Sequence, residues 1–156
     1  MPVEYVIDAN VLLEAANYYY SFELNTGFWE WLAEQGRLGR IRSLTLVQAE
    51  IEFPLPLVDW LHEREPEAFF IDASEPEIQV AYAEMSTWII GQQFGPEHIA
   101  KFLDGADLWV IAAARVRGAA VVTQEKAAGP GAKKIKIPDI CRQFGISLSF
   151  SRPHAT

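Results

Sequence analysis

One stretch, residues 104–125, constrains the fold more than any other part of the sequence. It begins with Asp104 at a predicted N-cap and Asp107 three residues later, continues through apolar residues 108–114, and stops at a glycine. These signals predict a buried helix. Residues 119–123 follow directly and are small or β-branched without polar alternation, as expected of a strand covered on both faces. A buried helix leading into a buried strand is typical of a parallel sheet between helices.

The rest of the chain alternates between strand and helix patterns in the same way. Capping-box spacing at Thr45 with Gln48, and at Ser74 with Glu77, predicts where two of the helices begin. The predicted strands are residues 3–7, 40–44, 69–71, 119–123 and 146–150. The predicted helices are residues 10–17, 27–35, 45–51, 58–65, 74–94, 104–118 and 138–144. We therefore expect one domain over residues 1–156, a three-layer α/β/α fold with a central, mostly parallel twisted sheet.

Composition excludes several other classes of protein. With 156 residues, half of them apolar, the chain is long enough to bury one core. A single cysteine, Cys141, rules out an intramolecular disulfide framework and a zinc–thiolate cluster. No apolar run approaches the roughly 18 residues that a membrane span needs, and the first residues show no signal-peptide pattern. We expect a soluble, cytoplasmic protein with no membrane contact.

The net charge of −8 is unevenly distributed. Residues 50–84 contain ten acids and one base, a charge of −9, so the remainder of the chain sums to +1. Two basic stretches stand outside that segment, and their residues are candidates for RNA contact, although a solvated surface is the ordinary explanation of such clusters. The candidates are Arg40 and Arg42, beside Arg37, and Lys126, Lys133, Lys134 and Lys136.

Four acids are candidates for a common site. In an open parallel sheet, ligands bind beyond the carboxyl ends of the strands. Asp8 follows the first predicted strand, Glu125 follows the strand at 119–123, and Asp107 lies in the first turn of the preceding helix. Glu50, on a helix of its own, is the natural fourth member. Clustered carboxylates typically hold Mg²⁺ or Mn²⁺, and two such ions activate water for phosphodiester hydrolysis.

Apart from Asp8, where an unpaired carboxylate is costly, the polar residues of these segments also have a purely structural interpretation. Asp104 is explained by its predicted N-cap role, and Asp107 by the preference of the helix dipole for an acid in the first turn. Glu50 and Glu125, taken singly, are ordinary surface acids. Thr123 is an ordinary strand residue.

Four segments resemble the signature segments of PIN-domain ribonucleases, in the same order along the chain. They are residues 6–10 (VIDAN), 44–50 (LTLVQAE), 104–113 (DGADLWVIAA) and 121–126 (VVTQEK). Residues 28–32 and 137–141 further resemble a PIN-like toxin branch related to VapC-type ribonuclease toxins. The resemblance covers most of the chain.

This resemblance implies a PIN-like fold and a metal-dependent endoribonuclease, the toxin of a type II toxin–antitoxin pair. Many relatives carry Asp at the fourth acidic position, where this chain has the longer Glu125, so the resemblance implies ligation there through water. The implied catalytic and metal-coordinating acids are Asp8, Glu50, Asp107 and Glu125, supported by Asn10, Thr123 and Asp104.

The resemblance also implies an RNA substrate, a cognate antitoxin and a homodimer. The acidic residues 50–84 are the predicted docking face for a basic antitoxin. The alternative is a catalytically weak or inactive PIN-like protein that binds RNA or acts as a scaffold. A haloacid-dehalogenase-like phosphatase is disfavoured because it needs an acid where Asn10 stands. A receiver-type phosphoacceptor domain is disfavoured because adjacent acids after the first strand are missing.

Overall fold

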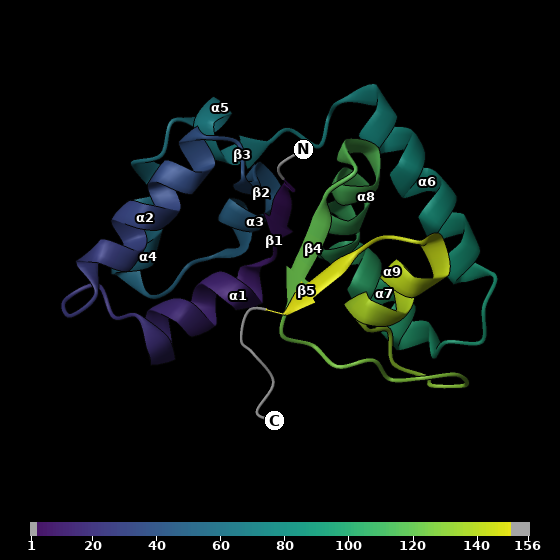
Figure 1. Ribbon diagram of the computed structural model, residues 1–156. Coiled ribbons are helices and arrows are strands. Elements are labelled where there is room, and N and C mark those ends of the chain that lie inside the picture. The colour runs from purple at the N-terminus through teal and green to yellow at the C-terminus, as the bar shows by residue number, and fades with distance from the viewer. Residues whose placement is uncertain (1–2, 151–156) are drawn as a thin grey trace.

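A five-stranded sheet runs through the centre of the computed structural model, which describes residues 3–150 (Figure 1). Its strand order is β3-β2-β1-β4-β5, and every neighbouring pair is parallel. β1 is the central strand, with Val6 opposite Arg42 of β2 and Val121 of β4. The strands are β1 (Tyr5–Ile7), β2 (Ile41–Leu44), β3 (Phe70–Ile71), β4 (Ala120–Thr123) and β5 (Leu148–Phe150).

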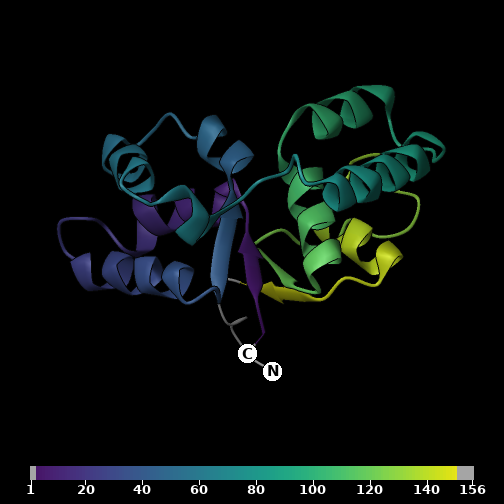
Figure 2. The same cartoon turned by 90° about the horizontal axis from the view of Figure 1, so that it is seen from above.

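Helices cover both sides of this sheet. Figure 2 shows the helices that precede α6 on one side and α6 to α9 on the other, which confirms the predicted three-layer α/β/α fold. In the part of the chain that is described, no helix is long and apolar enough to cross a membrane. The helices are α1 (Ala9–Glu14), the π-helix η1 (Ala15–Tyr19), α2 (Thr26–Arg37), α3 (Thr45–Glu50), α4 (Leu55–His62), α5 (Pro66–Phe69), α6 (Pro76–Ile90), α7 (Pro96–Asp104), α8 (Asp107–Arg117) and α9 (Ile137–Phe144).

The helix and strand predicted at 104–125 are present as α8 and β4, but the predicted N-cap is wrong. α8 begins at Asp107 with Ala106 as its N-cap, and Asp104 is the last residue of α7. The reason is that Pro96 starts an additional helix, which ends where Gly105 takes an extended conformation. The predicted end of the helix is confirmed: α8 ends before Gly118, which adopts the left-handed conformation with φ of 64°.

Both predicted capping boxes are also wrong. The N-cap of α3 is Leu44, and that of α6 is Glu75, with no side-chain capping bond at either. In α6 a proline at the first helical position sets the start instead, since its fixed φ suits that position. α6 ends at Ile90, four residues before the predicted end.

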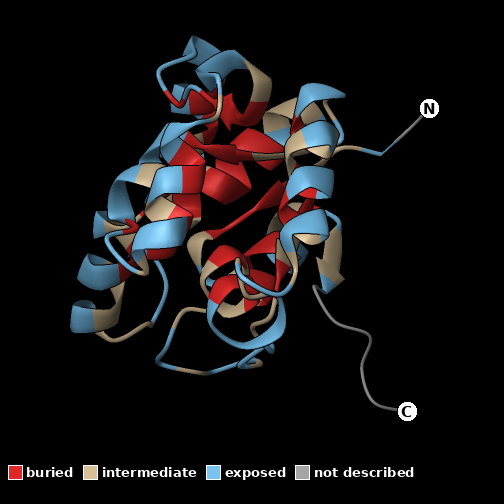
Figure 3. Ribbon diagram, turned by 90° about the vertical axis from the view of Figure 1, so that its left-hand side faces the viewer, coloured by how far each residue is buried: buried red, intermediate tan, exposed pale blue. Residues whose placement is uncertain are grey.

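The core lies between the sheet and its helices (Figure 3), and α8 is its most buried helix. Leu108 and residues 110–114 are all inaccessible to solvent, because α8 packs between the sheet and α6. β4 departs from prediction in one respect: Val122 is only half-buried and lines an open groove, so the strand is not fully covered on both faces. The buried α8 fixes its own first residue, Asp107, near the carboxyl ends of β1 and β4.

Candidate active site

Asp8 is the most buried acid of the described chain. It directly follows β1, caps α1 by accepting the N–H of Val11 on Oδ1 (3.0 Å), and is only 1% exposed. Its second oxygen, Oδ2, is buried without a hydrogen-bond partner among residues 3–150. Burial raises the pKa of Asp8 to about 7; the Val11 N–H opposes this, and the nearby charges of Asp107 and Glu125 add to it. An unpaired buried carboxylate is costly, so this position favours a proton or a cation.

Asp107 is electrostatically coupled to the same cluster. Its pKa is raised to about 6, mainly by burial and then by the charges of Glu125 and Glu50, while the ammonium group of Lys136 acts to lower it. Asp8 and Asp107 thus both interact with Glu125, and Glu50 interacts with Asp107. The structure therefore brings together the four acids that the sequence suggested as a common site.

Like Asp8, two of the other three acids accept hydrogen bonds from backbone amides at helix starts. Glu50 Oε1 accepts the N–H of Ala106, the N-cap residue of α8, at 2.6 Å. Glu125 Oε2 accepts the N–H of Ile137, the first residue of α9, at 2.8 Å. Gly105 matters to the first bond, because a Cβ at that position would lie 3.3 Å from Glu50 Oε1. The acids thereby satisfy amides that a helix leaves without partners.

Two hydroxyl side chains fix the strand ends that carry Asp8 and Glu125. Thr123 is buried, and its Oγ1 accepts the N–H of Glu125 at 3.1 Å. Ser43 is buried on β2, and its Oγ donates to the carbonyl of Ile7 at 2.8 Å, one residue before Asp8. The sequence prediction missed Ser43, because no local signal marks a serine of this strand for a bond to the neighbouring strand.

The other two predicted supporting residues, Asn10 and Asp104, are close to the acids in sequence, but their side chains do not hold the acids in place. Asn10 is exposed, and it acts on Asp8 through its backbone N–H, which lowers the pKa of that acid. Asp104 is exposed at the end of α7, two residues before the N-cap of α8. Neither side chain has a hydrogen bond within the described part of the chain that ties it to the cluster.

The structure separates the two basic stretches. Lys126 directly follows Glu125, and Lys136 is close enough to Asp107 to lower its pKa. Lys133 and Lys134 are exposed on the same loop between β4 and α9. Arg40, by contrast, precedes β2 and so lies at the opposite end of the parallel sheet from Asp8.

Arg42 is also remote from the strand ends that carry the acids. It pairs in register with Val6, two residues before Asp8, and its Nε is buried without a hydrogen-bond partner among residues 3–150. Its guanidinium group lies beside Gly39, which precedes β2, and so is directed away from the carboxyl edge.

The donor set suits a hard divalent cation, but its side chains are not closed around a single ion. All four groups are carboxylates, the ligands that Mg²⁺ and Mn²⁺ prefer, and Asp8 Oδ2 is a buried acceptor without a partner. Within residues 3–150, however, no three His, Cys, Asp or Glu side chains are arranged so that they could hold a metal ion. Glu50 and Glu125 each direct one carboxylate oxygen toward a backbone N–H at the start of a helix, and so away from a shared ion.

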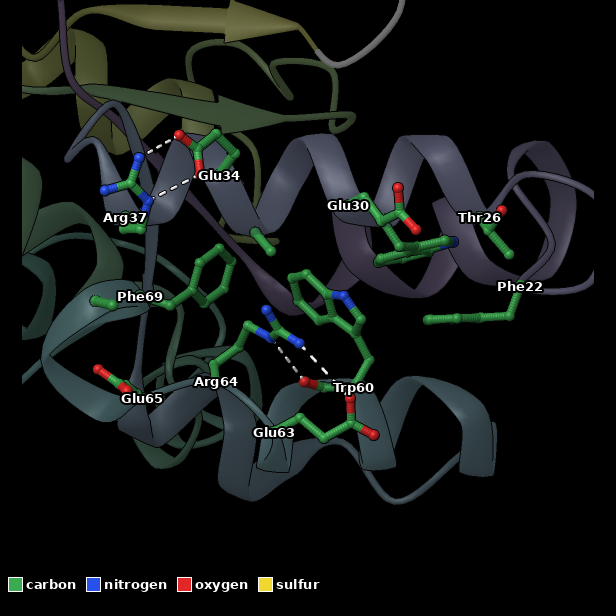
Figure 4. A pocket seen from close by; sticks show the side chains of 13 residues that line it. Phe22, Thr26, Glu30, Glu34, Arg37, Trp60, Glu63, Arg64, Glu65 and Phe69 are labelled. Carbon is green, nitrogen blue, oxygen red and sulfur yellow. Dashed lines mark hydrogen bonds and ion pairs between the residues drawn. The ribbon is translucent and has the colours of Figure 1, made fainter.

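The pocket between α2, α4 and α5 is a separate feature (Figure 4). It has a volume of about 630 Å³ and includes none of the four acids. Its cations are already partnered: Arg37 pairs with Glu34, and the Arg64 Nε donates to the Trp60 carbonyl at 3.0 Å. Four glutamates line it, Glu30 and Glu34 from α2 and Glu63 and Glu65 from the segment after α4.

Comparison with known proteins gives a family and a fold. The sequence matches the family described as "Domain of unknown function (DUF4411)" over residues 5–149. A chain in the crystal structure of VapBC2 from Rickettsia felis bound to a DNA fragment from their promoter has a similar fold, with 16% identity and a TM-score of 0.53. That match covers 94% of this chain and 97% of that one.

A second solved structure gives the same result. A chain of FitAB bound to an IR36 DNA fragment matches with 13% identity and a TM-score of 0.54, covering 97% of this chain and 99% of that one. No curated protein sequence matches. At these identities the likeness concerns the fold, which is PIN-like, with the all-parallel sheet described above.

Proposed function

The chain belongs to the DUF4411 family, and we propose that it is a divalent-metal-dependent endoribonuclease, the toxin of a type II toxin–antitoxin pair. The observation that carries this proposal is the acid cluster at the carboxyl ends of β1 and β4. Asp8 is buried there with one oxygen unpaired, and it interacts with Asp107 and Glu125. Divalent cations relieve the repulsion within such a cluster of carboxylates.

The proposed ligands of Mg²⁺ or Mn²⁺ are Asp8, Glu50, Asp107 and Glu125. When bound, the ions supply an activated water and neutralise the charge that develops on the leaving oxygen of a phosphodiester. Asp8 is suited to this role because Val11 holds Oδ1 and leaves Oδ2 available. Glu50 and Glu125 each use one carboxylate oxygen in a hydrogen bond to a backbone N–H, which leaves the other oxygen for a metal ion.

Neighbouring residues orient these acids and attract the substrate. Thr123 and Ser43 hold the backbone next to Glu125 and Asp8, which limits the freedom of both side chains. Lys126 and Lys136 place positive charge beside the cluster, where the phosphates of RNA would approach. RNA, rather than DNA, is the substrate that the sequence resemblance to PIN-domain ribonucleases suggests.

We further propose that the chain binds a basic antitoxin through its acidic face. Two structures that share its fold are those of VapBC2 and FitAB, each bound to DNA. In this chain, Glu63 and Glu65 of the acidic segment share a pocket with Glu30 and Glu34 of α2 (Figure 4). An excess of carboxylates around one hollow favours a partner that carries Lys or Arg.

A non-catalytic RNA-binding protein is the second candidate. It is favoured by the hydrogen bonds of Glu50 and Glu125 to helix-start amides, which give both acids a structural role without any metal. The two candidates differ in whether RNA is cleaved.

Cleavage of labelled RNA by the purified protein in Mg²⁺, Mn²⁺ or EDTA tests the proposal. We expect cleavage with either metal and none in EDTA. Asp8→Asn and Asp107→Asn should each reduce the rate by about 10²-fold or more, since metal catalysis supplies several kcal/mol.

The matched control is Glu23→Gln, which removes one negative charge from an exposed loop and should leave the rate unchanged. Calorimetric titration with Mn²⁺ separates the two candidates. If the wild-type protein binds Mn²⁺ but cleaves no RNA, the nuclease proposal is wrong and the non-catalytic one stands.

A further inference from the structure

An aromatic groove lies on the sheet face opposite to α8 and α9. Its volume is about 590 Å³, and its lining includes Ile7 of β1 and Val122 and Gln124 at the end of β4. Six of the lining side chains are aromatic, and none is charged. The aromatic residues are Tyr5, Tyr19, Tyr20, Phe28, Trp31 and Phe150.

The groove reaches the same strand ends that carry the acids. Gln124 lines the groove, while its neighbour Glu125 interacts with Asp8 and Asp107 in the acid cluster. Likewise, Ile7 lines the groove, while its neighbour Asp8 belongs to the cluster. The helix that borders the groove is tied to the cluster too, because the N–H of Val11 donates to Asp8. The groove and the acids are therefore two sides of one sheet edge.

The rings in this groove are arranged as a stacking surface. Tyr20 stacks on Phe28, with ring centres 4.0 Å apart and planes within 5° of parallel. Trp31 continues the row, with its ring centre 5.9 Å from that of Phe28. Trp31 is 50% exposed, although aromatic rings of this size are usually buried. A half-exposed row of rings favours a flat ligand that stacks on it.

The groove also contains an unused hydrogen-bond acceptor. Gln124 Oε1 is buried and has no hydrogen-bond partner among the described residues. An amide oxygen without a partner is unfavourable, and the amino group of a nucleobase would satisfy it. An apolar side chain from a protein partner would leave it unsatisfied.

The positive charge near this sheet edge lies outside the groove, as expected for binding of a single-stranded nucleic acid with its phosphates on one side and its bases on the other. The cations nearest the acids, Lys126 and Lys136, follow β4 on the loop toward α9 and are not part of the groove lining. Phosphates are thus attracted to the acid side of the sheet edge, and the uncharged aromatic side receives the bases.

We propose that this aromatic groove binds unpaired bases of the RNA strand whose phosphodiester lies at the acid cluster. The inference rests on the proposed nuclease function and adds to it a selectivity for single-stranded RNA. A base-paired strand has no free base faces to stack on Trp31 and Tyr20, so duplex RNA is excluded from the groove.

Binding of a fluorescein-labelled single-stranded RNA of about 12 nucleotides, followed by anisotropy in EDTA, tests the groove without cleavage. Trp31→Ala should weaken binding by about tenfold or more, as expected for loss of one base–aromatic stack. Trp31→Phe keeps a ring and should retain most of the affinity. The control Tyr18→Ala removes a ring that is 77% exposed outside the groove and should change affinity less than twofold.

Two further RNAs sharpen the test. A duplex of the same sequence should bind Trp31→Ala and the wild type equally, and an oligonucleotide with abasic sites should bind the wild type weakly. The proposal is overturned if the wild type does not bind the single strand, or if Trp31→Ala binds it as well as the wild type does. It is also overturned if Trp31→Ala spares RNA binding but abolishes binding of a protein partner or self-association.

Failure of the groove proposal is distinguishable from failure of the nuclease proposal. The binding assay in EDTA does not depend on catalysis, and the cleavage assay in Mn²⁺ uses the wild-type protein, in which Trp31 is intact. Wild-type cleavage together with unchanged binding by Trp31→Ala would overturn the groove alone.

Discussion

Asp8 shows most clearly how one residue connects sequence, stability and function. Its carboxyl is buried, and its pKa in the folded protein is raised from 3.8 to about 7. The folded state therefore binds more protons than the unfolded state between those two values. The free energy of unfolding of the metal-free protein must fall as the pH rises through this window, by up to about 4 kcal/mol.

Asp8→Asn should remove this dependence. In EDTA at pH 8 the variant should be more stable than the wild type, and the difference should shrink by about 2 kcal/mol or more when the pH is lowered to 5. Urea unfolding at both pH values measures it, with Glu23→Gln as a variant expected to show no such pH-dependent difference. A less stable Asp8→Asn protein at pH 8 in EDTA would mean that a partner inside the fold already compensates the carboxylate.

The candidate site residues were predictable to different degrees. Asp8 and Glu125 follow recognisable strands, so their place at the sheet edge was predictable from local sequence alone. The position of Glu50 could not be derived from local sequence, because its approach to α8 depends on how two helices that are distant in the sequence pack. Ser43 and Gly105 were missed for the same reason: each acts through a contact with a residue far away in the sequence.

At the scale of elements, the loop between β4 and α9 is the part most open to experiment. Asp139, in the first turn of α9, accepts the N–H of Ala128 at 2.8 Å and that of Gly129 at 3.2 Å. A further hydrogen bond runs from the N–H of Gly95 to the carbonyl of Lys133 at 3.1 Å. These bonds hold a loop without regular structure in one position relative to the acids.

Asp139→Ala should loosen this loop without unfolding the domain. Loss of the two bonds should destabilise the loop locally by about 1–2 kcal/mol and speed hydrogen exchange at Ala128 and Gly129. Affinity for RNA should fall modestly, because the loop lysines are then less well positioned. Asp139→Asn keeps one acceptor oxygen and should give an intermediate effect. Unchanged exchange across residues 126–136, measured by mass spectrometry, would contradict this role.

Elements with strong local signals were predicted well, and short ones were not. α8 and β4 combine a long apolar run with a glycine stop, so their existence followed from the sequence. α5 and α7 are short helices that begin at Pro66 and Pro96, and neither helix was predicted. The helix starts were the weakest point, since prolines or packed neighbours, and not the expected capping boxes, set them.

At the scale of the whole molecule, the net charge of −8 becomes compatible with an RNA partner. The four clustered acids account for −4, which two divalent cations would neutralise. Residues 52–84 contain nine acids and one base, a charge of −8, and every acid there is exposed, so the rest of the chain apart from the four clustered acids sums to +4. Away from that segment the metal-loaded surface would be mildly basic, with Lys126 and Lys136 beside the acids.

The exposed acids of residues 52–84 therefore have no evident use in RNA binding, since they would repel phosphate. They are suited to speeding association with a basic protein, because complementary potentials steer diffusional encounter. Glu65→Lys with Glu67→Lys should slow association with the proposed cognate antitoxin by about tenfold at low salt, and the difference should shrink as salt screens both surfaces. Surface plasmon resonance at about 50 mM and 500 mM salt measures both quantities.

The matched control reverses two exposed acids outside the segment, Glu23→Lys with Glu97→Lys, and changes the net charge by the same amount. If both double variants slow association equally, net charge alone governs the encounter and the acidic face is not a docking surface. If only the first slows it, while both cleave RNA as the wild type does, then one chain keeps its partner and its substrate on separate surfaces of opposite charge.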